Sequence, residues 1–79
     1  MSTAANIRTF IAETFFAEDY SDSDSFLQKG IIDSTGMLEL VAFVEQSFGF
    51  KVSDAELVPQ NLDSIDNLVK FVATKTGKA

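Results

Sequence analysis

The residues best placed to support chemistry lie in segment 30–40, where a carboxylate, Asp33, directly precedes a hydroxyl, Ser34, at the predicted start of the longest helix. Two assignments of the helix N-cap fit this pair. If Ser34 is the cap, its oxygen is taken up by a backbone N–H; if Asp33 is the cap, Ser34 becomes the first helical residue and its hydroxyl faces solvent. The second assignment is favoured, because Ile32 and Met37 then occupy the two positions of a hydrophobic staple.

A serine in this position suits a phosphate ester. The start of a helix presents unpaired N–H groups and a partial positive charge of about half a unit, which favours an anion by roughly 0.3 to 1 kcal/mol. Asp33 adds a carboxylate that could share a magnesium ion with an incoming pyrophosphate donor, since magnesium is usually held by one or two carboxylates and phosphate oxygens. Taken alone, the position of Ser34 fits a phosphorylated serine and an ordinary helix-start serine equally well.

The composition excludes most self-contained catalytic sites. The 79 residues include no cysteine and no histidine, which removes a disulfide scaffold, a cysteine nucleophile, a Ser-His-Asp triad and the common zinc ligand sets. A calcium loop starting at Asp22 also fails, because Leu27 stands where the invariant glycine belongs and Asp33 where the bidentate glutamate belongs. The sequence therefore offers no conventional acid-base or nucleophile constellation and no metal site, so any chemistry must come from carboxylates, hydroxyls, lysines or an added group.

Charge and hydropathy predict the setting. Twelve acidic and six basic residues give a net charge of -6, which would repel nucleic acid and anionic lipid and attract proteins with basic docking surfaces. Residues 1–6 lack the features of a signal peptide, and no apolar run approaches the roughly 20 residues that span a membrane. The expectation is a cytoplasmic protein without nucleic acid or membrane partners, and nothing in the sequence indicates oligomerisation, so we expect a monomer.

Hydrophobic periodicity predicts an all-α fold in a single domain, 1–79: a four-helix bundle of three longer helices and one short one. A first amphipathic helix is expected over about 3–16 and a second over about 34–48, stopped by Gly49, with a long loop over 17–33 whose polar half is solvated and whose apolar half enters the core. Segment 53–57 carries the signature of a short helical turn, and a last helix is capped by Asp63 or Ser64 and ends near Gly77.

The second helix has two expected faces. The core stripe comprises Met37, Val41, Val44 and Phe48, widened by Leu38 and Leu40. The outer face, with Phe43 on its flank, is predicted to dock partner enzymes and comprises Thr35, Glu39, Ala42 and Gln46. Phenylalanines are expected in the core, although Phe43 or Phe71 could line a cleft for an apolar ligand between the helices.

The pair Asp33-Ser34, followed by Glu39-Leu40 in a small acidic helical chain, resembles the acyl carrier and peptidyl carrier protein family. The resemblance covers nearly the whole chain, through Phe48, the turn at 52–56 and the closing helix that begins at Ser64. It implies an acyl-carrier-like bundle in which a phosphopantetheinyl transferase moves a 4'-phosphopantetheine arm from coenzyme A to Ser34. The arm supplies the thiol that the cysteine-free chain lacks, and acyl groups ride on it as thioesters.

One departure from the pattern of fatty acid synthesis concerns the cargo. The residue after the modified serine is usually leucine there, whereas this chain has Thr35 and then Gly36. That form looks more like carriers loaded by a separate adenylate-forming ligase, with acyltransferases or synthases as further partners. Fatty acid, polyketide, aminoacyl and D-alanyl cargo all stay open, as does a rival from another class, an unmodified acidic module that binds one protein.

Overall fold

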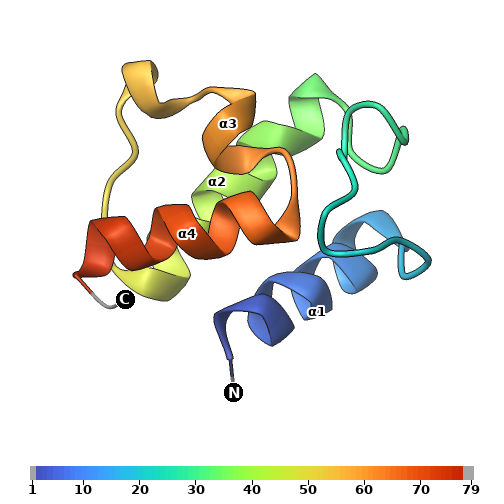
Figure 1. The fold of residues 1–79 in the computed structure, drawn as a ribbon, viewed down its shortest axis with the longest axis horizontal. Coiled ribbons are helices and arrows are strands. Elements are labelled where there is room, and N and C mark those ends of the chain that lie inside the picture. Colours follow the sequence, from blue (N-terminus) through green and yellow to red (C-terminus); the bar gives the residue numbers. More distant parts are fainter. Residues whose placement is uncertain (1, 78–79) are drawn as a thin grey trace.

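The fold is all-helical, as the periodicity predicts. A computed structural model describes residues 2–77, in which four α-helices and one 3-10 helix are joined without any strand (Figure 1). In chain order the elements are α1 (Thr3–Phe15), α2 (Ser34–Phe48), the 3-10 helix η1 (Asp54–Glu56), α3 (Pro59–Leu62) and α4 (Ile65–Thr76). The long helices α1, α2 and α4 pack as a small bundle, and α3 lies against α4.

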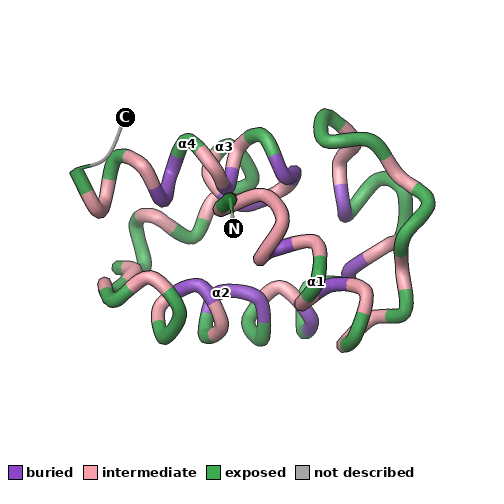
Figure 2. Tube along the Cα trace, turned by 90° about the horizontal axis from the view of Figure 1, so that it is seen from below, coloured by how far each residue is buried: buried purple, intermediate pink, exposed green. Residues whose placement is uncertain are grey.

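The core is formed by the inner faces of α1, α2 and α4, together with Leu62 of α3 and two side chains from the loop between α1 and α2. Figure 2 shows the buried positions of α2 on the side that faces α4 and its exposed positions on the opposite side. Burying these apolar side chains is the main source of stability in a domain of this size. The fully buried members are Ile7, Ile11, Phe26, Ile32, Leu40, Val44, Ile65 and Leu68.

The ends of α1 follow from local chemistry. At its start the hydroxyl of Ser2 accepts a hydrogen bond from the Ala5 N–H at 3.0 Å, a serine N-cap. At its end Phe16 takes a left-handed conformation with φ of 57°, and its backbone N–H donates to the Ala12 carbonyl. This conformation is unusual for a bulky residue. Burial of the Phe16 side chain does not offset the cost of this conformation, since 88% of the residue is exposed.

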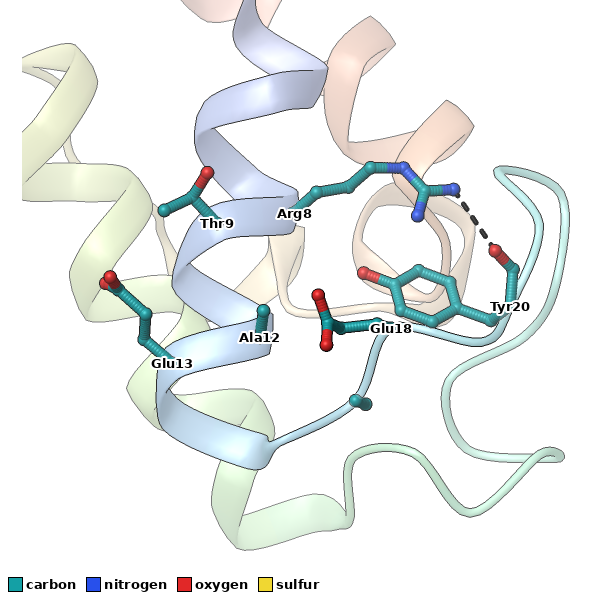
Figure 3. Close-up of a pocket in the computed structure, with 7 residues that line it drawn as sticks. Arg8, Thr9, Ala12, Glu13, Glu18 and Tyr20 are labelled. Atoms are coloured by element: carbon teal, nitrogen blue, oxygen red, sulfur yellow. Dashed lines mark hydrogen bonds between the residues drawn. The ribbon is translucent and has the colours of Figure 1, made fainter.

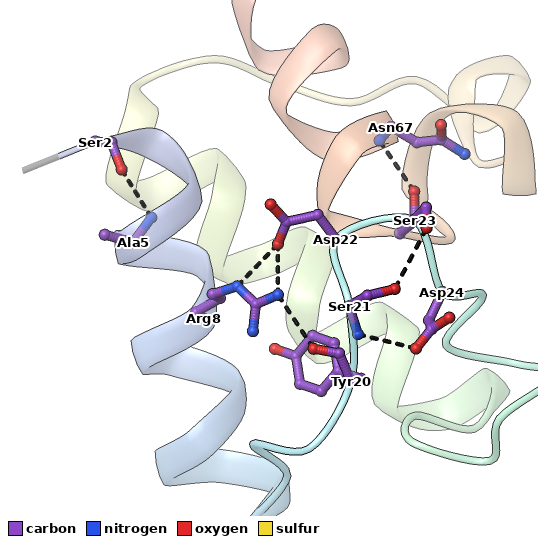
Figure 4. Close-up of polar contacts among 10 residues, drawn as sticks. Ser2, Ala5, Arg8, Tyr20, Ser21, Asp22, Ser23, Asp24 and Asn67 are labelled. Carbon is purple, nitrogen blue, oxygen red and sulfur yellow. Dashed lines mark hydrogen bonds and ion pairs between the residues drawn. The ribbon is translucent and has the colours of Figure 1, made fainter.

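The loop over 17–33 is more firmly attached than its composition suggests. Its apolar half enters the core as predicted, with Phe26 and Ile32 buried. Its polar half is attached at two points, which the prediction of a solvated segment missed. The Arg8 guanidinium pairs with the Asp22 carboxylate (Figure 4). The Asp22 carbonyl accepts a hydrogen bond from the Asp66 N–H at 3.0 Å. The loop therefore ties α1 to the start of α4.

The chain between α2 and α4 differs from the prediction in one respect. The predicted turn at 53–57 is present as the 3-10 helix η1, but a second short helix, α3, follows at Pro59 and was not predicted. Proline favours a helix start here, because the N–H that it lacks would have no partner within the helix at the first position. The cap of α4 is Ser64, whose hydroxyl accepts from the Asn67 N–H at 3.0 Å.

Asp63, the other candidate for this cap, has a different role. Its carboxylate accepts hydrogen bonds from the Ser25 hydroxyl and from the Leu27 N–H, the latter at 3.0 Å, and its carbonyl accepts from the Phe26 N–H at 3.0 Å. These bonds anchor the loop before α2 to the segment before α4. The Asp63 side chain is thus occupied with a distant part of the chain, which sequence spacing does not reveal.

Candidate functional site

The start of α2 has the geometry that leaves Ser34 free. The Asp33 carboxylate accepts a hydrogen bond from the Gly36 N–H at 2.7 Å, which makes Asp33 the N-cap and Ser34 the first helical residue. Ser34 is exposed, and its hydroxyl has no hydrogen bond with another residue of 2–77. Ile32 and Met37 both pack into the core, as the staple requires. The capping prediction is confirmed.

Gly36 is explained by a close approach within the chain. A Cβ atom built at this position would lie 2.8 Å from a ring carbon of Phe15 and 2.9 Å from the Ile32 Cγ2. Carbon atoms do not pack at such distances, so the absence of a side chain lets the end of α1 lie against the first turn of α2. Gly36 therefore fixes the place of the turn that carries Asp33 and Ser34.

An apolar groove of about 190 Å³ adjoins Ser34. Three of the few large hydrophobic residues that are exposed, Leu27, Leu38 and Leu57, gather on it. No charged side chain lines it, so it suits an uncharged and largely apolar group. The lining comprises Leu27, Ser34, Met37, Leu38, Val41, Leu57, Val58, Pro59 and Leu62.

The groove corrects the assignment of Leu38 and adds residues that the sequence reading missed. Leu38 was expected in the core stripe, but it is 62% exposed and belongs to the groove. Its offset by one position from Met37 was the available signal, because neighbouring residues point about 100° apart on a helix. The opposite wall, Leu57 to Pro59, comes from the connection into the unpredicted α3 and carried no comparable signal.

The predicted outer face of α2 is present. Thr35, Glu39, Ala42 and Gln46 are all exposed. Phe43, expected at its flank, is half-buried and stacks on the Phe10 ring with 4.2 Å between centroids. Phe43 is therefore only partly available to this face.

Of the two phenylalanines that were expected in the core or at a cleft between the helices, Phe43 lines a hollow of about 390 Å³ between α1 and α2. Phe71 is buried, and its ring packs edge-on against Phe50 with 5.9 Å between centroids. Neither Phe43 nor Phe71 lines the groove. Both phenylalanines serve packing.

A separate hollow of about 400 Å³ lies between α1 and the chain that follows it (Figure 3). The Arg8 guanidinium there stacks over the Tyr20 ring, 4.6 Å from its centroid, and donates to the Tyr20 carbonyl at 3.3 Å. Burial raises the pKa of the Tyr20 hydroxyl, an effect that the positive charge of Arg8 opposes. Because Arg8 also pairs with Asp22, its contacts in this hollow hold the loop against α1.

Comparison with protein-family models and with curated proteins gives no match to this chain. Within residues 2–77, no helix is long and apolar enough to cross a membrane. The structure describes a small helical bundle. An exposed serine, Ser34, stands at the capped start of α2 beside a groove that no charged side chain lines.

Proposed function

We propose that this protein is a carrier that holds acyl or aminoacyl groups on a 4'-phosphopantetheine arm attached to Ser34. The observation that carries the proposal is the position of this serine: Asp33 takes the capping bond, so the Ser34 hydroxyl projects into solvent at the positive end of α2. A transferase can reach such a hydroxyl without unfolding the helix. The carrier itself catalyses nothing.

The attachment is a phosphoryl transfer to the Ser34 oxygen. This oxygen forms a new bond to the coenzyme A phosphorus that bears the pantetheine part, the pyrophosphate bond breaks, adenosine 3',5'-bisphosphate leaves, and the serine proton passes to a base of the transferase. The exposed Asp33 carboxylate can take part in holding the magnesium ion that such donors carry. The arm then supplies the thiol on which the cargo forms a thioester.

The surroundings of Ser34 support a carrier. The groove offers apolar walls to the arm or its cargo, and it begins at the residue that would bear the arm. On the outer face of α2, Thr35, Glu39 and Ala42 present one charge and small side chains, which suits a docking strip for several enzymes in turn. The partners proposed are the transferase, an adenylate-forming ligase and the acyltransferases or synthases that receive the cargo.

Intact mass spectrometry after incubation with coenzyme A, magnesium and a broad-specificity phosphopantetheinyl transferase tests the proposal. We expect the native chain to gain the mass of one phosphopantetheine and Ser34→Ala to gain none. Ser53→Ala is a matched control, because Ser53 is an exposed serine that also precedes a helical turn, and it should gain the arm. No gain in the native chain would overturn the carrier and favour the unmodified interaction module.

A further inference from the structure

One wall of the groove at Ser34 is held in place by few buried side chains. Leu57, Val58 and Pro59 join η1 to α3, and η1 itself contains no buried residue. The first buried side chain after η1 is Leu62, at the end of α3. Polar contacts therefore have a large share in holding the chain that leads into this wall.

Several of those contacts meet at one residue, Glu56, while the Pro59 carbonyl accepts a separate hydrogen bond from the Asn67 side chain at 3.3 Å. The Glu56 carboxylate accepts hydrogen bonds from the Ser53 N–H at 3.0 Å and from the Lys75 ammonium at 3.0 and 3.1 Å. The Glu56 carbonyl accepts two more, from the Val58 N–H at 2.9 Å and the Asn61 side chain at 3.0 Å. Glu56 thus connects the start of η1, the wall and the last turn of α4.

The Glu56–Lys75 ion pair is less exposed than a typical surface pair, which strengthens it. The side chains of Glu56 and Lys75 are only 28% and 27% exposed, and the Lys75 ammonium also lies 5.9 Å from the centroid of the Phe50 ring. Partial removal from water strengthens the attraction of opposite charges. Lys75 comes from a helix that is anchored in the core through Phe71 and Val72.

We propose that Glu56 and Lys75 form a clasp that holds the Leu57–Val58–Pro59 wall in place and so sets how far the groove beside Ser34 can open. Both are positioning residues, since neither lines the groove itself. The clasp is a property of the unmodified chain. Only the inference that the clasp controls the space beside the arm rests on the proposed carrier function.

Hydrogen exchange of the unmodified protein tests the clasp first. Lys75→Met removes the charge and keeps the stem, and Lys70→Met is the matched control, an exposed lysine of the same helix with no ion pair among residues 2–77. In Lys75→Met the amides of Leu57, Val58 and Asn61 should exchange roughly two- to fivefold faster, with the amides of α2 unchanged. High salt should produce the same change in the native chain and not in Lys75→Met.

The effect of the clasp on the groove is then measured with an arm attached to Ser34. Coenzyme A whose thiol carries a pentyl thioether serves as donor, and nuclear Overhauser contacts are measured from the pentyl protons to the methyl groups of Leu57 and Val58. These contacts should be present in the native chain and in Lys70→Met, and at least about halved in Lys75→Met.

Exchange rates that are equal in Lys75→Met and Lys70→Met overturn the clasp. Normal exchange effects combined with unchanged pentyl contacts overturn its control of the groove. A chain that takes no arm at all overturns the carrier function, while the exchange result still decides the clasp.

Discussion

At the scale of single residues, Asp33 combines a structural and a chemical task that substitution can separate. Asp33→Ala should lower the free energy of unfolding by about 1 kcal/mol, because the Gly36 N–H loses its acceptor. Asp33→Asn should keep the stability, since asparagine caps as well as aspartate, yet slow attachment of the arm because the carboxylate is gone. Urea unfolding and the initial rate of mass gain measure the two effects. An unchanged rate in Asp33→Asn would leave Asp33 with the capping role alone.

Gly36 offers a second test at this scale. Alanine would gain up to about 1 kcal/mol in helix propensity, but its Cβ would meet Phe15 and Ile32 at 2.8 and 2.9 Å, and overpacking typically costs about 1–3 kcal/mol. A net loss on the order of 1 kcal/mol is expected for Gly36→Ala in urea unfolding. The double variant Gly36→Ala, Phe15→Leu should lose less stability than the sum of the two single losses, because the smaller leucine side chain leaves room for the new Cβ. Strict additivity would show that Phe15 is not the obstacle.

At the scale of elements, the link from η1 to α4 should depend on pH through Glu56. The hydrogen bond from the Ser53 N–H, followed by that from Lys75, lowers the pKa of this carboxyl below its ordinary value of 4.5. Its contribution to stability is therefore complete above pH 4.5 and is lost as the pH falls through the lower folded-state pKa.

Urea midpoints measured across the acid range should show this loss. Glu56→Gln lacks the contribution at every pH, so its midpoint should fall less steeply on acidification than that of the native chain. Some dependence should persist in the variant, because the pKa of Asp24 is also lowered, chiefly by the Ser21 N–H. Parallel curves would rule out Glu56 as a contributor.

The elements also show what sequence can and cannot predict. The bounds of α2 follow from signals within a few residues: an aspartate cap, a regular apolar stripe and Gly49 in the left-handed conformation that ends the helix. The capped start of α2, with Ser34 exposed, was predictable for the same reason. The groove was not, because its walls come from Leu27, Leu38 and Leu57, which meet only in the folded chain.

At the scale of the whole molecule, Phe26 is the loop residue on which the bundle depends most. It is fully buried although it lies outside every helix, and its N–H donates to the Asp63 carbonyl. Phe26→Ala should cost about 3–5 kcal/mol, a large part of the roughly 4–12 kcal/mol expected for a domain of this length.

Circular dichroism during thermal and urea unfolding would measure this loss. The neighbouring Leu27→Ala is the control, since Leu27 is 42% exposed and should lose less than about 1 kcal/mol. Similar losses for the two variants would mean that the loop is not held by its buried ring.

The exposed ring of Phe16 bears on how copies of the molecule behave toward one another in solution. At neutral pH the net charge of -6 keeps them apart, so a lone apolar side chain at the surface is harmless. Acid removes that repulsion by protonating carboxylates, and concentrated salt screens it, while the ring stays uncovered. Colloidal stability is therefore greatest in neutral buffers of low ionic strength, the conditions in which concentrated samples are best kept.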